Sequence, residues 1–290
     1  MSTLSDLVNA QGLSSDADIE WLHRLVGDGQ LLADLAFADI VIWVPTADDS
    51  FVAVAHTRPS GAATLFYRDI VGDRVRPQWH TQVREAFVSG SIVDSSSPDW
   101  FEETPTRVRA VAIRRHAGPD EETEPPIIGV LTRHTNLGEL RAPSRQQTTF
   151  NACADDLFSM IASGHFPDLT SPPSPRRGSP RASDGLIRID TDGITTFASP
   201  NALSAFNRMG FDDELEGESL SEVTTELLPA QQNVDESLPL VVSGRAPWRA
   251  DIEARGVTVS LRSIPLRDQG HRSGAVVLCP PLFEERKASA

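Results

Sequence analysis

Cysteine, lysine and long apolar runs are scarce in this 290-residue sequence. The two cysteines, Cys153 and Cys279, lie far apart and provide no disulfide framework. Lys287 is the only lysine, and the formal net charge of −15 leaves no broad basic surface for nucleic acid or anionic lipid. No run of ~18 apolar residues indicates a membrane helix, and Asp6 stands where a signal peptide would be basic. We therefore expect a cytosolic protein that binds neither nucleic acid nor membrane.

Motifs for catalysis and for metal binding are also missing. The sequence has no Gly-rich phosphate loop, GxSxG elbow, HExxH or CxxC, so we expect no enzymatic activity of this chain. Its histidines have neither helical pair spacing nor a close companion cysteine or histidine, which excludes the usual structural metal sites. These residues are His23, His56, His80, His116, His134, His165 and His271. We predict neither metal nor haem, and the identity of any other cofactor is unknown.

Proline is concentrated in residues 167–183 (PDLTSPPSPRRGSPRAS), where five of the seventeen residues are proline. A segment without apolar periodicity buries too little surface to offset its ordering entropy, so we expect an extended linker. A phosphorylation target or a docking site for a proline-binding partner is the alternative. The linker divides the chain into a first domain (1–166) and a second domain (184–283), followed by a C-terminal tail (284–290).

Each domain is predicted to be α+β, with a central antiparallel sheet flanked by helices. In the first domain, two apolar runs at 40–44 (IVIWV) and 51–55 (FVAVA) flank a short polar turn and predict a hairpin. Helical spacing begins after capping residues at 14–16 and continues to residue 35. The other predicted elements are a helix at 77–88, strands at 107–114 and 127–133, and a closing helix at 143–163.

The second domain has a different order of elements. Strands at 186–190 and 194–198 flank an Asp-Gly turn. Short helical pieces reach residue 209 and cover 220–228. Three further strands are predicted at 248–253, 257–265 and 273–278. Apolar side chains are expected to fill a core rather than to line a cofactor cavity; they are Phe197, Leu203, Phe206, Leu228, Trp248 and Leu261.

The start of the second domain (DGLIRIDTDGITTFASPNALSAFNRMGF) resembles the opening of a PAS domain. Residues 190–193 match the D-x-x-G turn of that family, and residues 199–202 match its strand-to-helix corner. Residues 217–220 (GESL) match the usual entry to the central helix. In this resemblance Gly193 supplies the positive-φ turn, and Asn201 ties the corner through its side chain.

The first domain resembles a GAF domain, with a leading helix, a six-stranded antiparallel sheet and a closing helix. Segments such as QLLADLAFADIVIWV, GVLTRH and FPD extend the resemblance to the GAF–PAS input region of actinobacterial PdtaS-type sensor histidine kinases, over nearly the whole chain. The resemblance implies a cytosolic two-component sensor that binds a small ligand or reports a chemical state and so regulates kinase autophosphorylation. It also implies a kinase core in cis and a response regulator downstream.

The sequence also departs from these kinases. It contains neither a phosphoacceptor box nor ATP-binding motifs, so we expect that this polypeptide does not autophosphorylate. Residues 278–283 (LCPPLF) replace the acidic Asp-x-Thr signature that usually closes a PAS domain. Two hypotheses stay open: the chain is the input part of a longer kinase, or it is a kinase-less GAF–PAS interaction and dimerisation protein. Helices at 16–35 and 143–163 are amphipathic enough to form a homodimer.

A GAF pocket lies between the sheet and the loops that cover it. The candidate ligand residues in that position are Trp43, His56, Arg58, Arg114 and Arg133. Arginines there would clamp a nucleotide or another anionic ligand by bidentate hydrogen bonds. The simpler interpretation, which we favour, is that the arginines lie on the rim or the solvated face and pair with the abundant acids. In the second domain, residues 184–236 contain twelve acids and two arginines, which disfavours an anionic ligand.

Overall fold

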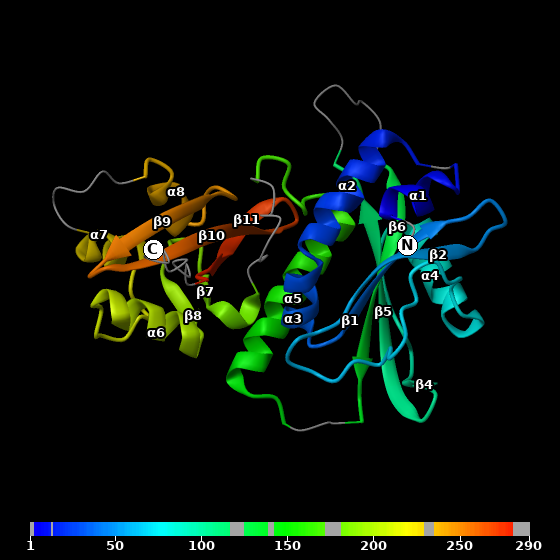
Figure 1. Cartoon of the computed structure of the whole chain (residues 1–290), viewed down its shortest axis with the longest axis horizontal. Coiled ribbons are helices and arrows are strands. Elements are labelled where there is room, and N and C mark those ends of the chain that lie inside the picture. The colour runs from blue at the N-terminus through cyan, green and yellow to red at the C-terminus, as the bar shows by residue number, and fades with distance from the viewer. Residues whose placement is uncertain are drawn as a thin grey trace, which may run out of the picture. The chain divides into compact units, whose positions relative to one another are not determined.

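The computed structural model describes residues 3–12, 14–116, 125–138, 142–171, 181–228 and 235–280. The predicted tail, residues 172–180 of the predicted linker and most of the acidic loop before residue 127 lie outside them. The chain forms two compact units, one over residues 1–168 and the other over most of residues 180–280. Each unit contains one antiparallel sheet flanked by helices, which confirms the predicted α+β class (Figure 1).

The first unit is built on a six-stranded sheet in the order β2-β1-β6-β5-β3, with β4 paired to β5. The predicted hairpin is present, and a β-bulge lies between Ile42 and Trp43. The sequence analysis missed the two short edge strands, which lack an apolar run long enough to be recognised. The strands are β1 (Asp39–Pro45), β2 (Phe51–Thr57), β3 (Ile92–Asp94), β4 (Asp99–Phe101), β5 (Thr104–Arg114) and β6 (Ile127–Asn136).

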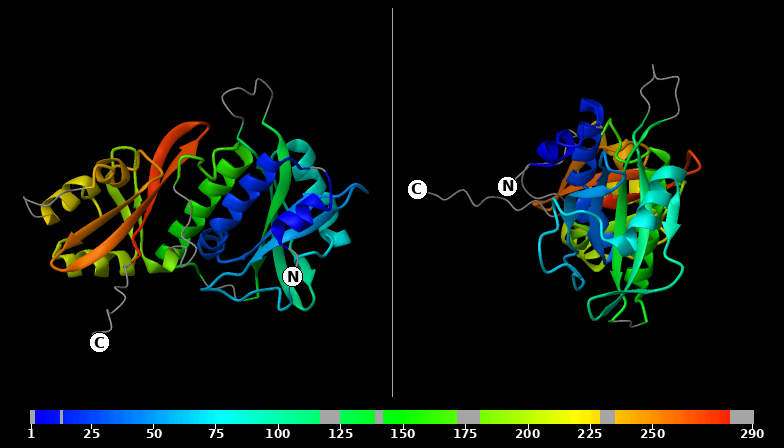
Figure 2. Two further views of the ribbon diagram at one scale, coloured as in Figure 1. Left: turned by 45° about the horizontal axis from the view of Figure 1, so that its top comes forward. Right: turned by 90° about the vertical axis from the view of Figure 1, so that its right-hand side faces the viewer.

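Helices cover both faces of this sheet. The helices are α1 (Leu4–Asn9), α2 (Asp16–Gly27), α3 (Gly29–Ala36), α4 (Pro77–Ser89) and α5 (Arg145–Ser163). Helices α3 and α5 lie on one side of the sheet and α4 lies on the other (Figure 2). The segment predicted as one helix from residue 16 to 35 is two helices. The first helix ends and the second begins at Asp28. An added Cβ at Gly29 would lie 2.8 Å from the Thr57 hydroxyl, so glycine at this position allows the start of α3 to approach Thr57 closely.

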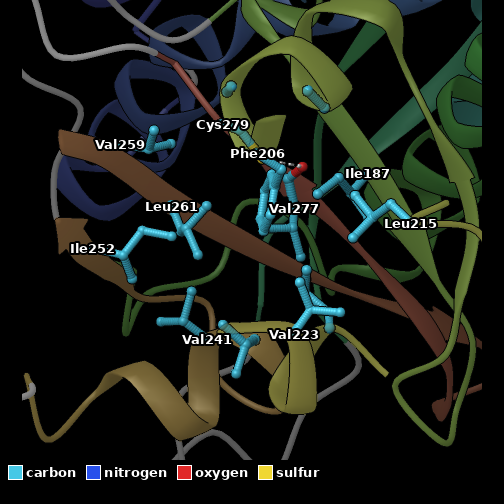
Figure 3. Packing of buried hydrophobic residues seen from close by; sticks show 14 of the residues in the cluster. Ile187, Phe206, Leu215, Val223, Val241, Ile252, Val259, Leu261, Val277 and Cys279 are labelled. Atoms are coloured by element: carbon cyan, nitrogen blue, oxygen red, sulfur yellow. Dashed lines mark hydrogen bonds between the residues drawn. The ribbon is translucent and has the colours of Figure 1, made fainter. Parts of the chain in front are cut away.

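The second unit contains a five-stranded sheet in the order β8-β7-β11-β10-β9. Its strands are β7 (Leu186–Ile189), β8 (Thr195–Ala198), β9 (Arg249–Ala254), β10 (Val257–Asp268) and β11 (His271–Leu278). Three helices, α6 (Pro200–Met209), α7 (Leu220–Leu227) and α8 (Leu238–Val242), complete the unit. Figure 3 shows the apolar core, in which Phe206, Leu261 and Val277 meet.

The predicted core of the second unit is correct except at Trp248. Phe197, Phe206 and Leu261 are buried, and Leu203 and Leu228 pack against the cluster. Trp248 is 37% exposed, because it precedes the first residue of β9 and lies beyond the end of the strand. Both cysteines are buried free thiols.

The turn and the corner of the second unit are held by short polar contacts. Gly193 has a φ of 83° and donates its N–H to the Asp190 carbonyl. Ser199 is the N-cap of α6, and its hydroxyl accepts from the N–H groups of Ala202 and Leu186. The Asn201 amide instead donates to the Ser183 carbonyl at 2.6 Å, so it connects α6 to the residues before β7. The corner is therefore capped by Ser199, and Asn201 ties the preceding turn.

Gly129 in β6 leaves room for the backbone of β1, and its substitution tests how closely these strands pack. A Cβ at this position would lie 2.5 Å from the Trp43 carbonyl oxygen, whereas a Cβ at exposed Gly61 would meet nothing within 4 Å. We expect Gly129→Ala to lower the unfolding free energy of the first unit by about 1–3 kcal/mol. The matched Gly61→Ala variant changes it by less than about 0.5 kcal/mol. Urea unfolding followed by tryptophan fluorescence measures both, and equal effects would contradict the close packing.

Candidate functional site

The sheet face toward α4 carries a small polar group in apolar surroundings. Asp39 of β1 pairs with His134 of β6, and Val41 pairs with Thr132, so these side chains share one face of the sheet. Asp39, Thr132 and His134 are all 0% exposed. The side chain of His56, from β2, is 1% exposed and lies beside them. Buried polar groups of this kind require hydrogen-bond partners.

Asp39 finds its partners in the irregular segment that covers the sheet, residues 58–76. Its carboxylate accepts hydrogen bonds from the Thr64 hydroxyl (2.7 Å) and from the Leu65 N–H (2.7 Å). The third contact is with Nε2 of His56 at 3.0 Å. Because a carboxylate only accepts, Nε2 of His56 donates its hydrogen in this contact.

A second chain of hydrogen bonds runs through Thr132. The Trp43 indole N–H donates to the Thr132 hydroxyl at 2.7 Å, and that hydroxyl lies 2.8 Å from Nε2 of His134. The indole is a donor only, so the Thr132 hydroxyl accepts from it. Nε2 of His134 is the one other contact of this hydroxyl within the described residues, so the hydroxyl hydrogen is donated to Nε2. Burial lowers the pKa of His134 to about 3. The ring is therefore neutral at physiological pH and carries its hydrogen on Nδ1.

Aromatic rings enclose these polar side chains. We define the front-face cluster as Trp43, His56, Phe66, Trp79, Phe101 and His134. Phe66 lies at its centre, with edge-to-face ring contacts to four other members at centroid distances of 5.0–5.8 Å. Trp79 stacks on Phe101, and the ring centroids of Trp79 and His134 are 4.5 Å apart. The guanidinium of exposed Arg76 lies 4.5 Å from the Phe101 ring.

Three nitrogen atoms of the front-face cluster have no hydrogen-bond partner within the described part of the chain. They are Nδ1 of His56, Nδ1 of His134 and Nε1 of Trp79, and all three are buried. Leaving a buried donor or acceptor unpaired costs about 1–3 kcal/mol. Groups of this kind are uncommon in native proteins, and each calls for an explanation.

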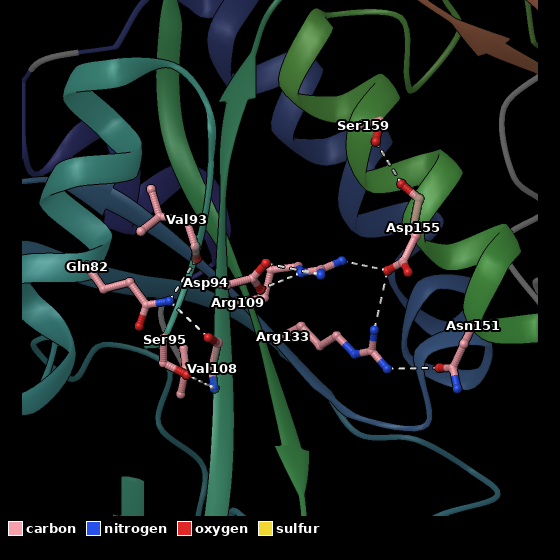
Figure 4. Close-up of polar contacts among 10 residues, drawn as sticks. All are labelled: Gln82, Val93, Asp94, Ser95, Val108, Arg109, Arg133, Asn151, Asp155 and Ser159. Carbon is pink, nitrogen blue, oxygen red and sulfur yellow. Dashed lines mark hydrogen bonds and ion pairs between the residues drawn. The ribbon is translucent and has the colours of Figure 1, made fainter. Parts of the chain in front are cut away.

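A groove of about 510 Å³ opens beside the cluster, between α4 and the segment from β3 to β4. Trp79 lines it and is thus shared with the cluster. Gln82 links α4 to β3 and β5 at the groove: its side-chain amide donates to the carbonyls of Val93 (2.8 Å) and Val108 (2.9 Å), as Figure 4 shows. The lining residues are Gln78, Trp79, Thr81, Gln82, Glu85, Val93, Asp94, Ser95, Ser96, Ser97, Pro98, Asp99 and Val108. None of these residues is basic, and Glu85 and Asp99 are acidic; the carboxylate of the third acid, Asp94, is paired with Arg109. The lining therefore disfavours an anionic ligand.

The opposite face of the sheet carries an ion-pair network that reaches α5 (Figure 4). Arg109 of β5 donates to both carboxylate oxygens of Asp94 (2.7 and 3.2 Å) and to Asp155 of α5 (2.7 Å). Arg133 of β6 approaches Asp155 at 3.5 Å and donates to Asn151 at 2.8 Å. The hydrogen bond to Asp94 raises the pKa of Arg109, whereas burial lowers the pKa of Arg133. The network connects edge strand β3 to α5.

The candidate ligand residues predicted from sequence lie in three places. Trp43 and His56 belong to the front-face cluster. Arg58 lies at the covering segment, where it donates to the carbonyls of Phe66 and Arg68, each at 3.0 Å. Arg114 donates to the Ala162 carbonyl of α5 (3.1 Å), and Arg133 belongs to the network on the same face. The three arginines therefore do not converge on one position.

Sequence reasoning missed most of the front-face cluster. Thr132 and His134 alternate within an apolar strand, and this spacing places two polar side chains on one buried face. That signal was available in the sequence. Phe66 gave no such signal, because it lies in an irregular segment whose path depends on contacts with Asp39.

Comparison with known proteins identifies the family of the chain. Residues 4–154, which contain the whole front-face cluster, match the family profile described as the histidine kinase PdtaS GAF domain. The chain belongs to the family of PdtaS histidine-kinase GAF domains. Residues 180–287 match the PAS fold, so the chain contains a GAF domain followed by a PAS domain, as predicted.

Relatives of the same architecture are found among sensor kinases. The chain is 36% identical over 300 residues to the sensor histidine kinase PdtaS of Mycobacterium tuberculosis and 35% identical over 294 residues to that of Mycolicibacterium smegmatis. Each match covers 99% of this chain and 57% of the relative's length. A solved structure described as the sensor region of a sensor histidine kinase is 34% identical, with a TM-score of 0.74, over 97% of this chain and 98% of that chain. The PdtaS-type chain is thus a sensor region of a histidine kinase.

Two features are absent from the described part of the chain. No helix there is long and apolar enough to cross a bilayer. Within the same residues, no group of three or more histidine, cysteine, aspartate or glutamate side chains is arranged to hold a metal ion.

Burial of neutral His134 makes the stability of the GAF domain depend on pH. The pKa of His134 is about 3 in the folded state, below its ordinary value of 6.5, so the unfolded state binds more protons below about pH 6.5. The unfolding free energy therefore falls as the pH decreases from about 6.5 towards 3, with a slope of up to about 1.4 kcal/mol per pH unit from this one group. Asp39 and His56 are the titratable groups that face it.

We expect His134→Gln to remove this part of the slope while it keeps a side-chain acceptor for Thr132. Urea unfolding between about pH 7 and pH 5 measures the difference. His56→Gln is the matched control for removing an imidazole from the same cluster. A pH dependence in His134→Gln as steep as in the wild type would contradict the assignment of a neutral buried ring.

Proposed function

We propose that this chain is the ligand-sensing input region of a cytosolic two-component histidine kinase, and that the GAF domain binds a small molecule at the front-face cluster. The observation that carries the proposal is the set of three unpartnered buried nitrogens beside an open groove. A purely structural core gains nothing from such atoms. Their cost is offset if a ligand supplies the missing partners.

The regulated activity in this proposal is autophosphorylation by a kinase core in cis, with transfer to a response regulator and a homodimer as the working form. These parts are supported by the similarity to PdtaS kinases, of which this chain spans 57%. The network Asp94–Arg109–Asp155 supplies a physical route from the site to α5. Asp94 borders the groove, so a ligand that moves β3 also moves a partner of α5.

Ligand binding is tested by a thermal-shift screen of the whole purified chain against uncharged, cationic and anionic metabolites. A compound that binds only the native state raises the unfolding free energy by about 2.7 kcal/mol at a concentration 100 times its Kd. We expect at least one uncharged compound to stabilise the wild type and to stabilise Trp79→Phe less, because that variant lacks the indole N–H. If no compound in a broad library shifts the unfolding transition, ligand sensing by this chain is contradicted.

The route to α5 is tested with Arg109→Gln, in a fusion of this chain to the kinase core of the Mycobacterium tuberculosis relative. We expect the variant to bind the ligand with unchanged affinity but to reduce the ligand-induced change in autophosphorylation about fivefold or more, the lower end of ordinary coupling between sites. Arg107→Gln is the matched control, since it removes the same charge from an exposed position of the same strand. An equal loss of response in both variants would show that the network does not carry the signal.

A further inference from the structure

We propose that Phe66 occupies the position of the ligand in the GAF domain, and that the ligand is an uncharged, planar heteroaromatic molecule with at least one hydrogen-bond acceptor. The inference rests on the proposed function, and it adds the chemistry of the ligand and the side chain that it displaces.

The first argument is the position of Phe66. It belongs to an irregular covering segment rather than to a strand or helix, yet it is only 2% exposed. Its ring lies between two histidines and two aromatic rings that belong to the sheet and to α4. A planar molecule in the same place keeps the edge-to-face contacts that Phe66 now makes.

The second argument is the chemistry of the unpartnered nitrogens around this ring. Nδ1 of His134 and Nε1 of Trp79 are N–H donors, and Nδ1 of His56 lies beside them without a partner in the described part of the chain. A phenyl ring offers them only weak N–H···π contacts. A heteroaromatic ring with a ring nitrogen or a carbonyl offers the two donors a hydrogen-bond acceptor.

The third argument concerns charge. The carboxylate of Asp39 is already satisfied by three contacts, and His134 is neutral. The neighbouring groove has no basic lining residue, so nothing inside it compensates an anionic group. A cation would in turn meet the N–H donors of His134 and Trp79. An uncharged ligand therefore fits best, which differs from the nucleotide expected from the arginines.

Arg58 fixes the backbone position of Phe66. Its guanidinium donates to the backbone carbonyl of Phe66 itself and to that of Arg68. For the ring to leave the cluster, residues 66–68 must move, and these two hydrogen bonds break. Arg58 is therefore a positioning residue that sets how easily the ligand displaces Phe66.

The experiment compares two apolar cavities in the same core. Phe66→Ala opens a cavity beside the unpartnered nitrogens, whereas Phe51→Ala removes an equally buried phenylalanine, 2% exposed, whose ring contacts are with His80 and Phe87. The probes are benzimidazole, which is uncharged at mildly alkaline pH and has one donor and one acceptor, and indene, an apolar ring system of the same shape. Titration calorimetry on the whole chain gives the affinities.

We expect Phe66→Ala to bind benzimidazole at least about tenfold more tightly than the wild type does, and more tightly than it binds indene. Phe51→Ala should show no preference for benzimidazole. His134→Phe in the Phe66→Ala background should remove most of that preference. If Phe66→Ala does not fold, Phe66→Leu keeps most of the volume without the ring and should show the same order of affinities with a smaller gain.

Two results overturn the proposal. If Phe66→Ala binds indene as tightly as benzimidazole, the nitrogens do not pair with a ligand. If neither Phe66 variant binds benzimidazole better than the wild type, Phe66 does not occupy the site. A natural ligand that binds the wild type and Phe66→Ala with equal affinity also contradicts the displacement of Phe66 by the ligand, but it leaves the proposed function intact. Conversely, benzimidazole binding by Phe66→Ala with no effect of any ligand on a fused kinase contradicts the proposed function alone.

Discussion

The GAF domain depends on the satisfaction of one buried carboxylate. Asp39 lies at the start of β1, 0% exposed, where a carboxylate without donors would be severely destabilising. Thr64 and Leu65 of the covering segment and His56 of β2 provide the contacts that it needs. The segment is thus held over the sheet by a polar requirement rather than by its own secondary structure. Phe66 follows the anchored residue directly, which explains how an irregular segment places a ring at the centre of the cluster.

Strand β6 serves two different environments through the alternation of its side chains. Thr132 and His134 face the aromatic cluster, whereas Arg133 between them faces α5. The same alternation in β5 places Val108 beside the groove and Arg109 in the ion-pair network. A sheet of this kind is stiff along its hydrogen-bonded ladder. Strand β5 therefore borders both the groove and the ion-pair network.

Much of the fold could be predicted from sequence because the strands carry strong local signals. The runs IVIWV and FVAVA with a polar turn between them specify a hairpin almost without tertiary information. The break between α2 and α3 could not be predicted in the same way, since it depends on the contact of Gly29 with Thr57 of a later strand. The positions of the three candidate arginines could not be predicted from sequence either. Arg58, Arg114 and Arg133 look equivalent in sequence, and only the strand register and the path of the covering segment separate them.

Individual buried polar side chains of the chain differ in how many of their polar atoms are paired. In the PAS domain, buried Ser199 and Thr224 bond to nearby backbone groups, so they cap and close helices. In the GAF domain, one nitrogen of His56 and one of His134 forms a hydrogen bond, and the other nitrogen of each ring has no partner among the described residues. A histidine that serves only packing is replaced at little cost by an apolar side chain, whereas an imidazole with one fixed and one open nitrogen has its tautomer set in advance. The contact made by one nitrogen therefore fixes the orientation of each imidazole ring and the direction in which its other nitrogen points.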